Sequence, residues 1–144
     1  MDLDKPILNE QAIKDLREGF TNLREPVTVA VFTKAGLNDQ YNKVCTRLIT
    51  EIAAVDGRIR AEFHDIGGEA SGRYGVELSP TVLIAPDRYK IRFTGTPLGE
   101  EGQTLVMSLI LASSGKASVL SPGSVKKLET LGEKRHVTVY VSPT

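Results

Sequence analysis

The chain contains one cysteine, Cys45, and the position of this residue limits the thiol chemistry available. Cys45 lies on the apolar stripe of a predicted helix, beyond the first turn, where the helix dipole no longer helps a thiol to ionise. A cysteine on such a stripe usually behaves as a small buried hydrophobic residue. We therefore expect Cys45 to be structural, with a redox-sensing thiol as the alternative.

Two adjacent carboxylates, Glu100 and Glu101, are the next candidates for chemistry. Neighbouring positions on a helix point in different directions, which suits shared proton transfer poorly. Both follow Pro97, a residue typical of a first helical turn, where acidic side chains offset the positive end of the helix dipole. A structural role is therefore favoured over catalysis.

Other patterns argue against metal, nucleotide and anion sites. His64 and His136 lie far apart in the sequence and near no cysteine pair, so we expect no structural zinc site. The stretch "GGEASG" lacks the spacing of a dinucleotide-binding loop. Arg88, Lys90 and Arg92 share one face of a predicted strand, and a solvated face is favoured over an anion site.

The composition is that of a globular domain: 144 residues, 40% hydrophobic and 25% charged. Eighteen basic residues balance eighteen acidic ones, so the bulk charge attracts neither nucleic acid nor an anionic membrane. The first residues lack the apolar core of a signal peptide, and the longest apolar run, "LVMSLILA", is too short to cross a bilayer. We expect a cytoplasmic protein without nucleic-acid or membrane partners.

Hydrophobic periodicity predicts the elements that carry these residues. A helix over 9–23 is capped by Asn9 and ends before Pro26, and the β-branched run 27–32 predicts a buried strand. The next helix is capped by Asn38 or Asp39. Its one-sided stripe consists of Tyr41, Val44, Cys45, Leu48, Ile49 and Ile52. The segment 58–66 alternates as a strand, with Ile59, Ala61 and Phe63 on one face.

The second half predicts a hairpin and further helices. "GGEASGRYGVE" is a short helix or a loop, and strands over 81–85 and 89–95 flank the turn "APDR". A helix runs from Pro97 to Gly115, and a short helix over 121–134 precedes a strand over 136–141. A helix joins the first two strands, which should therefore be parallel. The sequence predicts an α/β fold, with a four-stranded mixed sheet flanked by helices.

Two stretches resemble a known fold family. "YGVELSPTVLIA" resembles the segment in which the thioredoxin and glutaredoxin fold places a cis-proline before its third strand. "IRFTGTPLGEE" resembles a motif of tandem thioredoxin-like proteins, namely protein disulfide oxidoreductases and the N-terminal region of the alkyl hydroperoxide reductase flavoprotein. The resemblance covers residues 16–144 and implies a thioredoxin-like (glutaredoxin-like) fold. It also implies a cis-proline loop formed by Ser79, Pro80 and Thr81. Gly102 departs from the motif, because relatives carry an aromatic residue there.

The same resemblance implies where the reactive dithiol would lie, at the start of the helix after the first strand. Counting from Phe32 puts this degenerate dithiol position at Asn38 and Tyr41, neither of which can attack a sulfur. Glu101 matches the glutamate of the family motif. Together with Val106 and Ile110, on a helix that is apolar nearly all round, it is a candidate for tuning or contacting a neighbouring unit.

The V-T-V-x-V pattern of residues 27–31 recurs at 137–141, in "HVTVYVSPT". In the tandem proteins a second unit begins with such a strand. We therefore expect an N-terminal helix in 1–26, a thioredoxin-like unit lacking C-x-x-C in 27–115, and in 116–144 a linker helix with the first strand of a truncated second unit. The alternative is a natural C-terminus with one added edge strand.

The resemblance implies a redox-inactive N-terminal unit of a thiol–disulfide oxidoreductase, similar to thioredoxin reductase or the alkyl hydroperoxide reductase flavoprotein. Such a unit would give scaffold and docking to a downstream C-x-x-C unit in electron transport and cell redox homeostasis. The chain itself would bind no cofactor, whereas a longer parent would use FAD and NAD(P)H. The expected partners are the downstream unit and the flavoprotein domain of the same chain, with a homodimer left open.

Two other functions remain as alternatives. The first is a free-standing, non-catalytic interaction module on a thioredoxin-like scaffold. The second is an enzyme that uses Cys45 in monothiol chemistry.

Overall fold

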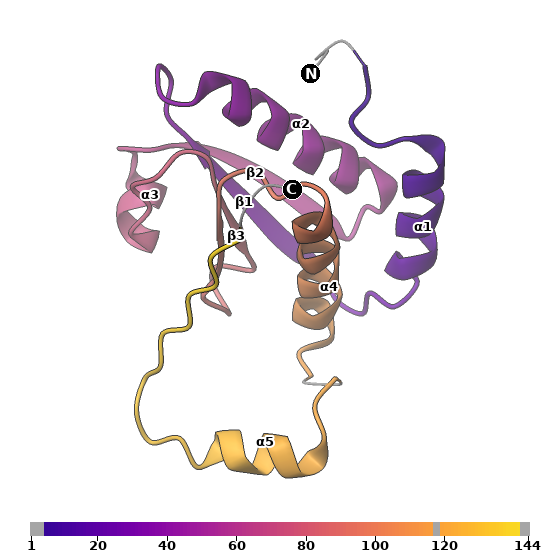
Figure 1. The fold of residues 1–144 in the computed structure, drawn as a ribbon, viewed down its shortest axis with the longest axis vertical. Helices are drawn as coiled ribbons and strands as arrows, with labels where there is room; N and C mark the ends of the chain where they lie inside the picture. The colour runs from indigo at the N-terminus through magenta and orange to yellow at the C-terminus, as the bar shows by residue number, and fades with distance from the viewer. Residues whose placement is uncertain (1–4, 117–118, 142–144) are drawn as a thin grey trace.

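The computed structural model describes residues 5–116 and 119–141, and its centre is a four-stranded sheet in the order β2-β1-β3-β4 (Figure 1). The strands are β1 (Val27–Thr33), β2 (Ile59–Asp65), β3 (Thr81–Ile84) and β4 (Ile91–Thr94). β1 pairs with β2 in parallel and with β3 antiparallel, and β3 and β4 form an antiparallel hairpin. The predicted mixed sheet with flanking helices is confirmed.

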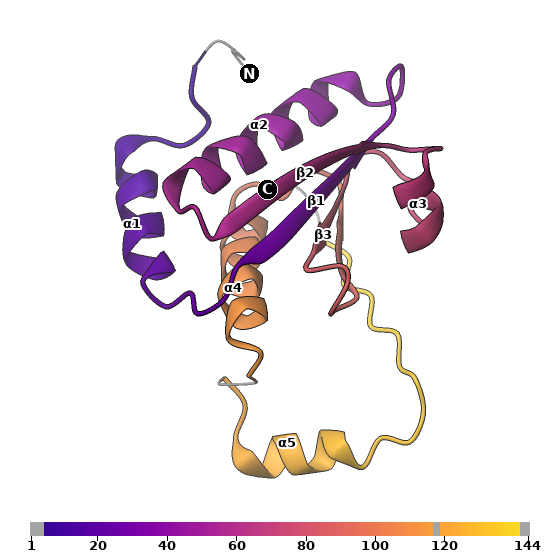
Figure 2. The same ribbon diagram turned by 180° about the vertical axis from the view of Figure 1, so that it is seen from behind.

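Five helices surround or follow the sheet: α1 (Glu10–Phe20), α2 (Asp39–Val55), α3 (Glu69–Tyr74), α4 (Glu100–Ser114) and α5 (Pro122–Glu129). α1 packs against both α2 and α4, and α3 lies at the opposite end of the sheet (Figures 1 and 2). α5 has no buried residue and lies apart from the other helices in both views.

The alternation of side chains along β1 divides the interior into two layers, because successive residues of a strand face opposite sides. Val27, Val29 and Val31 join the main core with residues of α1, α2 and α4. Ala30 and Phe32 face the other side and join a smaller cluster beneath α3. Both faces of β1 are therefore buried, as its continuous β-branched run predicts.

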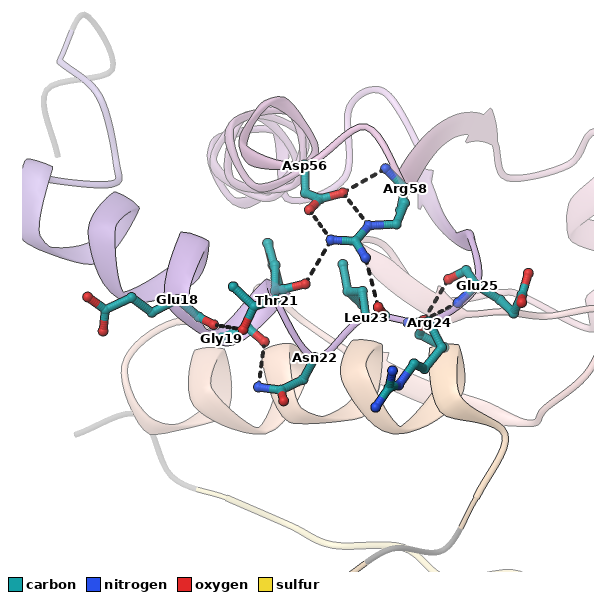
Figure 3. Close-up of polar contacts among 11 residues, drawn as sticks. Glu18, Gly19, Thr21, Asn22, Leu23, Arg24, Glu25, Asp56 and Arg58 are labelled. Atoms are coloured by element: carbon teal, nitrogen blue, oxygen red, sulfur yellow. Dashed lines mark hydrogen bonds and ion pairs between the residues drawn. The ribbon is translucent and has the colours of Figure 1, made fainter.

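The ends of α1 are fixed by side chains, and Figure 3 shows the contacts at its C-terminal end. As predicted, Asn9 caps the first turn, since its Oδ1 accepts from the backbone N–H of Ala12 at 2.8 Å. At the other end the Arg58 guanidinium donates to the carbonyls of Phe20 (2.9 Å) and Leu23 (2.7 Å) and pairs with Asp56 (2.7 Å). Hydrogen bonds from Arg58 lower the pKa of Asp56 to about 2. α1 is therefore tied to the beginning of β2.

The start of α4 differs from the prediction. The helix begins at Glu100 rather than at Pro97, because Gly99 adopts φ 59° and ψ −126°, a conformation outside the helical region that glycine tolerates. Glu100 and Glu101 still occupy the first turn, and the predicted end at Gly115 is confirmed.

Two predicted core positions are exposed instead. Tyr41 is 61% exposed, because in the first turn of α2 the neighbouring Asn42 turns inward and is 7% exposed. Phe63 is 48% exposed near the end of β2, an edge strand that is covered by another strand on one side only. The rest of the predicted stripe, from Val44 to Ile52, is buried as expected.

The predicted strand over 136–141 does not form. A strand needs backbone partners, and among the described residues none pairs with this segment. Its valines are largely exposed, and residues 142–144, the end of the predicted second-unit strand, lie outside the described residues. Among the helices of the described ranges, none combines the length and apolar character that a membrane crossing requires.

Candidate functional site

The degenerate dithiol position and the proline loop meet at one end of the sheet. The peptide bond between Ser79 and Pro80 is cis. Across from it, the side-chain amide of Asn38 donates to the Ser79 carbonyl at 2.7 Å. Asn38 has φ 60°, a left-handed conformation that asparagine tolerates better than most residues. The structure thus brings together the two loops that the sequence motif implies.

The predicted helix cap at this position is wrong. Asn38 occupies the cap position of α2, yet it makes no capping hydrogen bond, because its side chain is directed to Ser79. Asp39 accepts instead from the backbone N–H of Gly36 at 2.9 Å, which closes the preceding loop. Both side chains therefore shape the loop before α2 rather than its first turn.

A buried polar network fixes the two loops. The Ser79 hydroxyl accepts from the Lys34 backbone N–H and donates to Asn42 Oδ1, both at 2.8 Å. The Asn42 amide in turn donates to the carbonyls of Lys34 (3.1 Å) and Leu37 (2.8 Å). Ser79 and Asn42 are 6% and 7% exposed, so these bonds form away from solvent and hold the loops rigidly.

Asn42 is the functional residue that sequence reasoning missed. It lies one turn after Asn38 and next to Tyr41, and the periodic pattern favoured Tyr41 for burial instead. The sequence did contain a signal for Asn42. It is an asparagine four residues after Asn38, and this spacing puts the two residues on the same side of a helix.

Three large exposed hydrophobic residues lie close to Asn38 or Ser79 along the chain. Leu37 precedes Asn38, Tyr41 follows one turn later, and Leu78 precedes Ser79; they are 43%, 61% and 62% exposed. We call these three residues the apolar rim. The Thr96 hydroxyl donates to the Tyr41 carbonyl at 3.0 Å, and that of Thr81 to the Leu78 carbonyl at 2.6 Å. The backbone beneath the apolar rim is therefore anchored while its side chains face solvent.

Cys45 lies inside the main core, one turn beyond the site. It is fully buried, and burial raises the pKa of its thiol to about 12. A thiol with this pKa keeps its proton at neutral pH and is a poor nucleophile. The predicted burial of Cys45 is confirmed, whereas the nucleophile of a disulfide exchange would need an exposed, ionised sulfur.

The remaining predicted residues lie on α4. Glu101 is in its first turn, while Val106 and Ile110 are half-buried and pack against the main core. Ile110 lies against Gly19 of α1. Val106 and Ile110 thus contribute to the interior of this unit. Among the described residues, no cluster of histidine, cysteine, aspartate or glutamate has the arrangement of a metal site.

Known structures resemble this chain, although no protein-family model and no curated protein matches its sequence. A protein disulfide oxidoreductase from Aeropyrum pernix K1 superposes with a TM-score of 0.71 at 25% identity, covering 91% of this chain and 56% of that one. A variant of the alkylhydroperoxide reductase protein AhpF from Enterococcus faecalis gives 0.74 at 27% identity, covering 86% and 61%.

The N-terminal domain of that Enterococcus protein, solved separately, gives a TM-score of 0.68 at 26% identity, covering 83% of this chain and 58% of the other. The chain therefore spans between 56% and 61% of the length of these three solved chains. These likenesses confirm the thioredoxin-like fold and fit the tandem disulfide-oxidoreductase family that the motifs indicate.

Proposed function

We propose that this chain is the redox-inactive N-terminal unit of a thiol–disulfide oxidoreductase, and that it gives scaffold and docking to a downstream unit carrying C-x-x-C. The observation that carries the proposal is the contact between the Asn38 amide and the Ser79 carbonyl. This contact identifies the helix start that faces the cis-proline loop, and Asn38 and Tyr41 occupy it. Disulfide exchange at this place requires thiolates, which these residues lack.

The apolar rim supports the docking role. Exposed hydrophobic side chains that gather at one place mark contact surfaces. Here Leu37 and Leu78 stand on loops held by the buried bonds among Ser79, Asn42 and Lys34, and Tyr41 lies in the first turn of α2. A surface that is already fixed loses little conformational freedom when a partner binds.

We also propose that this unit is part of a longer protein. The neighbours that this chain resembles are longer and include a disulfide oxidoreductase and an alkylhydroperoxide reductase protein. In the proposed parent, electrons pass from NAD(P)H through FAD to the dithiol of the downstream unit, and from there to a peroxidase or a protein disulfide. The described unit would contact that unit and the flavoprotein domain, in the cytoplasm, and would bind neither cofactor itself.

An insulin-reduction assay tests both the inactivity and the position assigned to the lost dithiol. The chain as it stands should give no turnover above that of dithiothreitol alone. The double variant Asn38→Cys with Tyr41→Cys should gain activity, because it places two thiols one turn apart at the positive end of α2 and opposite Pro80.

The matched control carries Gln40→Cys and Lys43→Cys, which have the same spacing on the same helix. It should remain inactive because these positions are exposed on other sides of α2. Turnover by the unmodified chain would refute the redox-inactive role. Equal activity of the two double variants would show that the site has been placed wrongly.

A free-standing interaction module is the second candidate, since the exposed apolar rim could bind a partner without any downstream unit. The coding sequence beyond Thr144 separates the two functions. Cysteines spaced C-x-x-C within a few codons support the tandem oxidoreductase, and a stop codon supports the module.

A further inference from the structure

A cleft of about 520 Å³ opens between α2 and the carboxyl ends of β1 and β2. Thr33 and Asp65, the last residues of these parallel strands, line one wall, and side chains from residues 39–50 of α2 line the other. Figure 2 shows α2 lying across both strands. Ligands of open α/β sheets bind outside the carboxyl ends of the strands, and clefts of about 300–1,000 Å³ hold drug-sized molecules. The cleft therefore has the place and the size of a small-molecule site.

The cleft is distinct from the site formed by the lost dithiol position and the cis-proline loop. The sheet order puts β2 and β3 on opposite sides of β1. The cis-proline loop leads into β3, whereas the cleft lies on the β2 side, and Asn38, Ser79 and Pro80 are not among the residues that line it. Asn42 contributes to both places, because it lines the cleft and also accepts from the Ser79 hydroxyl.

Two opposite charges in the cleft have no partner. Four charged residues line it, namely Asp39, Lys43, Arg47 and Asp65. Arg47 pairs with Glu51 at 2.9 Å, and the Asp39 carboxylate accepts from the Gly36 N–H at 2.9 Å. The Lys43 ammonium and the Asp65 carboxylate, in contrast, form no hydrogen bond or ion pair within the described part of the chain. The cleft therefore presents one unpaired cation on α2 and one unpaired anion at the end of β2.

A ligand that carries both charges fits this lining better than a simple anion or cation does. An anion bound at Lys43 would be repelled by Asp65 across the cleft, and a cation bound at Asp65 would be repelled by Lys43. A zwitterion avoids both costs, because each of its charged groups meets the opposite charge.

The rest of the lining suits the peptide group. The hydroxyls of Thr33 and Thr46 form no hydrogen bond with any described residue, so each is available to a ligand amide or carbonyl. Ala35 and the threonine side chains also bring methyl groups to the cleft. Ligand sites commonly combine such apolar contacts with a few polar groups that fix orientation.

We propose that this cleft binds a short zwitterionic peptide of about three residues. The α-carboxylate of the peptide pairs with Lys43 and its α-ammonium pairs with Asp65. The peptide groups between the two ends bond the hydroxyls of Thr33 and Thr46. This binding requires neither the redox-inactive role nor the downstream unit proposed above.

NMR titration of the full chain with trialanine tests the binding, and two blocked forms of the same peptide are the matched probes. Trialanine should bind with a dissociation constant of about 1 mM, a value reasonable for a ligand of this size. Trialanine amide lacks the carboxylate and N-acetyl-trialanine lacks the ammonium. Each should bind about fivefold more weakly than trialanine, because one ion pair is lost.

Two substitutions assign the ends of the peptide. Lys43→Gln should weaken trialanine about fivefold and leave trialanine amide nearly unchanged, because the amide has no carboxylate for Lys43 to bind. Asp65→Asn should likewise weaken trialanine and leave N-acetyl-trialanine nearly unchanged. The controls are Lys14→Gln on α1 and Glu62→Gln on the opposite face of β2, which are both exposed and should leave all three affinities unchanged.

A bulky side chain tests the location. Thr46→Trp should abolish trialanine binding because the indole fills the cleft, whereas Thr104→Trp, at an exposed position of α4, should leave it intact. Thermal unfolding checks that both variants are folded.

Three results would overturn the proposal. One is the absence of saturable shifts with trialanine up to about 20 mM. Another is equal binding of N-acetyl-trialanine amide, because the two charges would then contribute nothing. The third is an equal effect of Lys43→Gln and Lys14→Gln on trialanine, since the carboxylate would then bind elsewhere.

Discussion

Ser79 joins the two loops of the site through one hydroxyl, which accepts from Lys34 and donates to Asn42. Ser79→Ala should lower the free energy of unfolding by about 2 kcal/mol, because a buried donor and a buried acceptor lose their partner. Denaturant unfolding measures this loss, and hydrogen exchange of the Lys34 amide should speed up in the variant. An unchanged exchange rate would mean that the hydroxyl does not hold the loop.

Cys45 should be nearly inert in the folded protein. Burial raises the pKa of its thiol from 9.0 to about 12, so at pH 8 the folded protein holds about 1000-fold less thiolate than the unfolded chain, and its reaction with a maleimide or an aromatic disulfide should be slower by about that factor. Parallel labelling with and without denaturant measures the ratio. Equal rates would make Cys45 a redox candidate again.

Asp56 contributes a pH-dependent part of the stability. Its pKa falls from 3.8 to about 2 through hydrogen bonds from Arg58, so the contribution is present above about pH 4 and is lost as the pH falls toward 2. Asp56→Asn should lower the free energy of unfolding by about 1–2 kcal/mol at neutral pH and flatten its decline between pH 4 and pH 2.

Urea unfolding at a series of pH values tests this prediction. Glu133→Gln is the matched control, because the Glu133–Arg135 pair is exposed and such pairs contribute little. If the free energy of unfolding of both variants falls with decreasing pH at the same slope as that of the parent chain, Asp56 is not the group responsible.

At the scale of elements, one hydroxyl connects α4 to the loop before β1. Ser113 Oγ accepts from the backbone N–H groups of Arg24 (2.7 Å) and Glu25 (2.9 Å) and donates to the Glu25 carbonyl (2.6 Å). Ser113→Ala should cost about 2–3 kcal/mol, because three backbone groups lose their partner in a buried place. Ser108→Ala, on the same helix, should cost less than about 0.5 kcal/mol. Thermal and urea unfolding of the two variants compare these costs.

The elements that sequence patterns predicted well are those whose signal is local. The continuous run of β1, the stripe of α2 from Val44 to Ile52 and the turn of the β3–β4 hairpin each follow from residues close together in the chain. The family motifs likewise indicated the cis-proline loop and the position of the lost dithiol, although the hydrogen bond between Asn38 and Ser79 could not be deduced from spacing.

The predictions that were wrong concern residues whose partners are distant in the sequence. Asn42 is buried and Tyr41 exposed because Ser79, 37 residues further along, provides a hydrogen-bonding partner for the asparagine. Hydrophobic periodicity reflects only residues that are close together in the sequence, so it cannot reveal such a partner. Residues 136–141 have strand composition but form no strand, because pairing depends on a neighbour and not on composition alone.

At the scale of the whole molecule, the last part of the described chain adds little to the stability of the rest. None of the α5 residues is buried. Removing residues 119–144 should therefore change the free energy of unfolding by less than about 0.5 kcal/mol. Urea unfolding at a concentration that keeps both chains monomeric compares them, and a large loss would show that this segment packs onto the sheet.

The attachment of α1 also decides where the molecule can be shortened. A recombinant version beginning at Val27 would retain every strand, yet it would uncover the core where Leu16, Phe20 and Leu23 now pack. It would also remove both carbonyls that receive the Arg58 guanidinium. The smallest piece suited to crystallography or NMR therefore starts at or before Asn9, with the first helix as an integral wall of the domain.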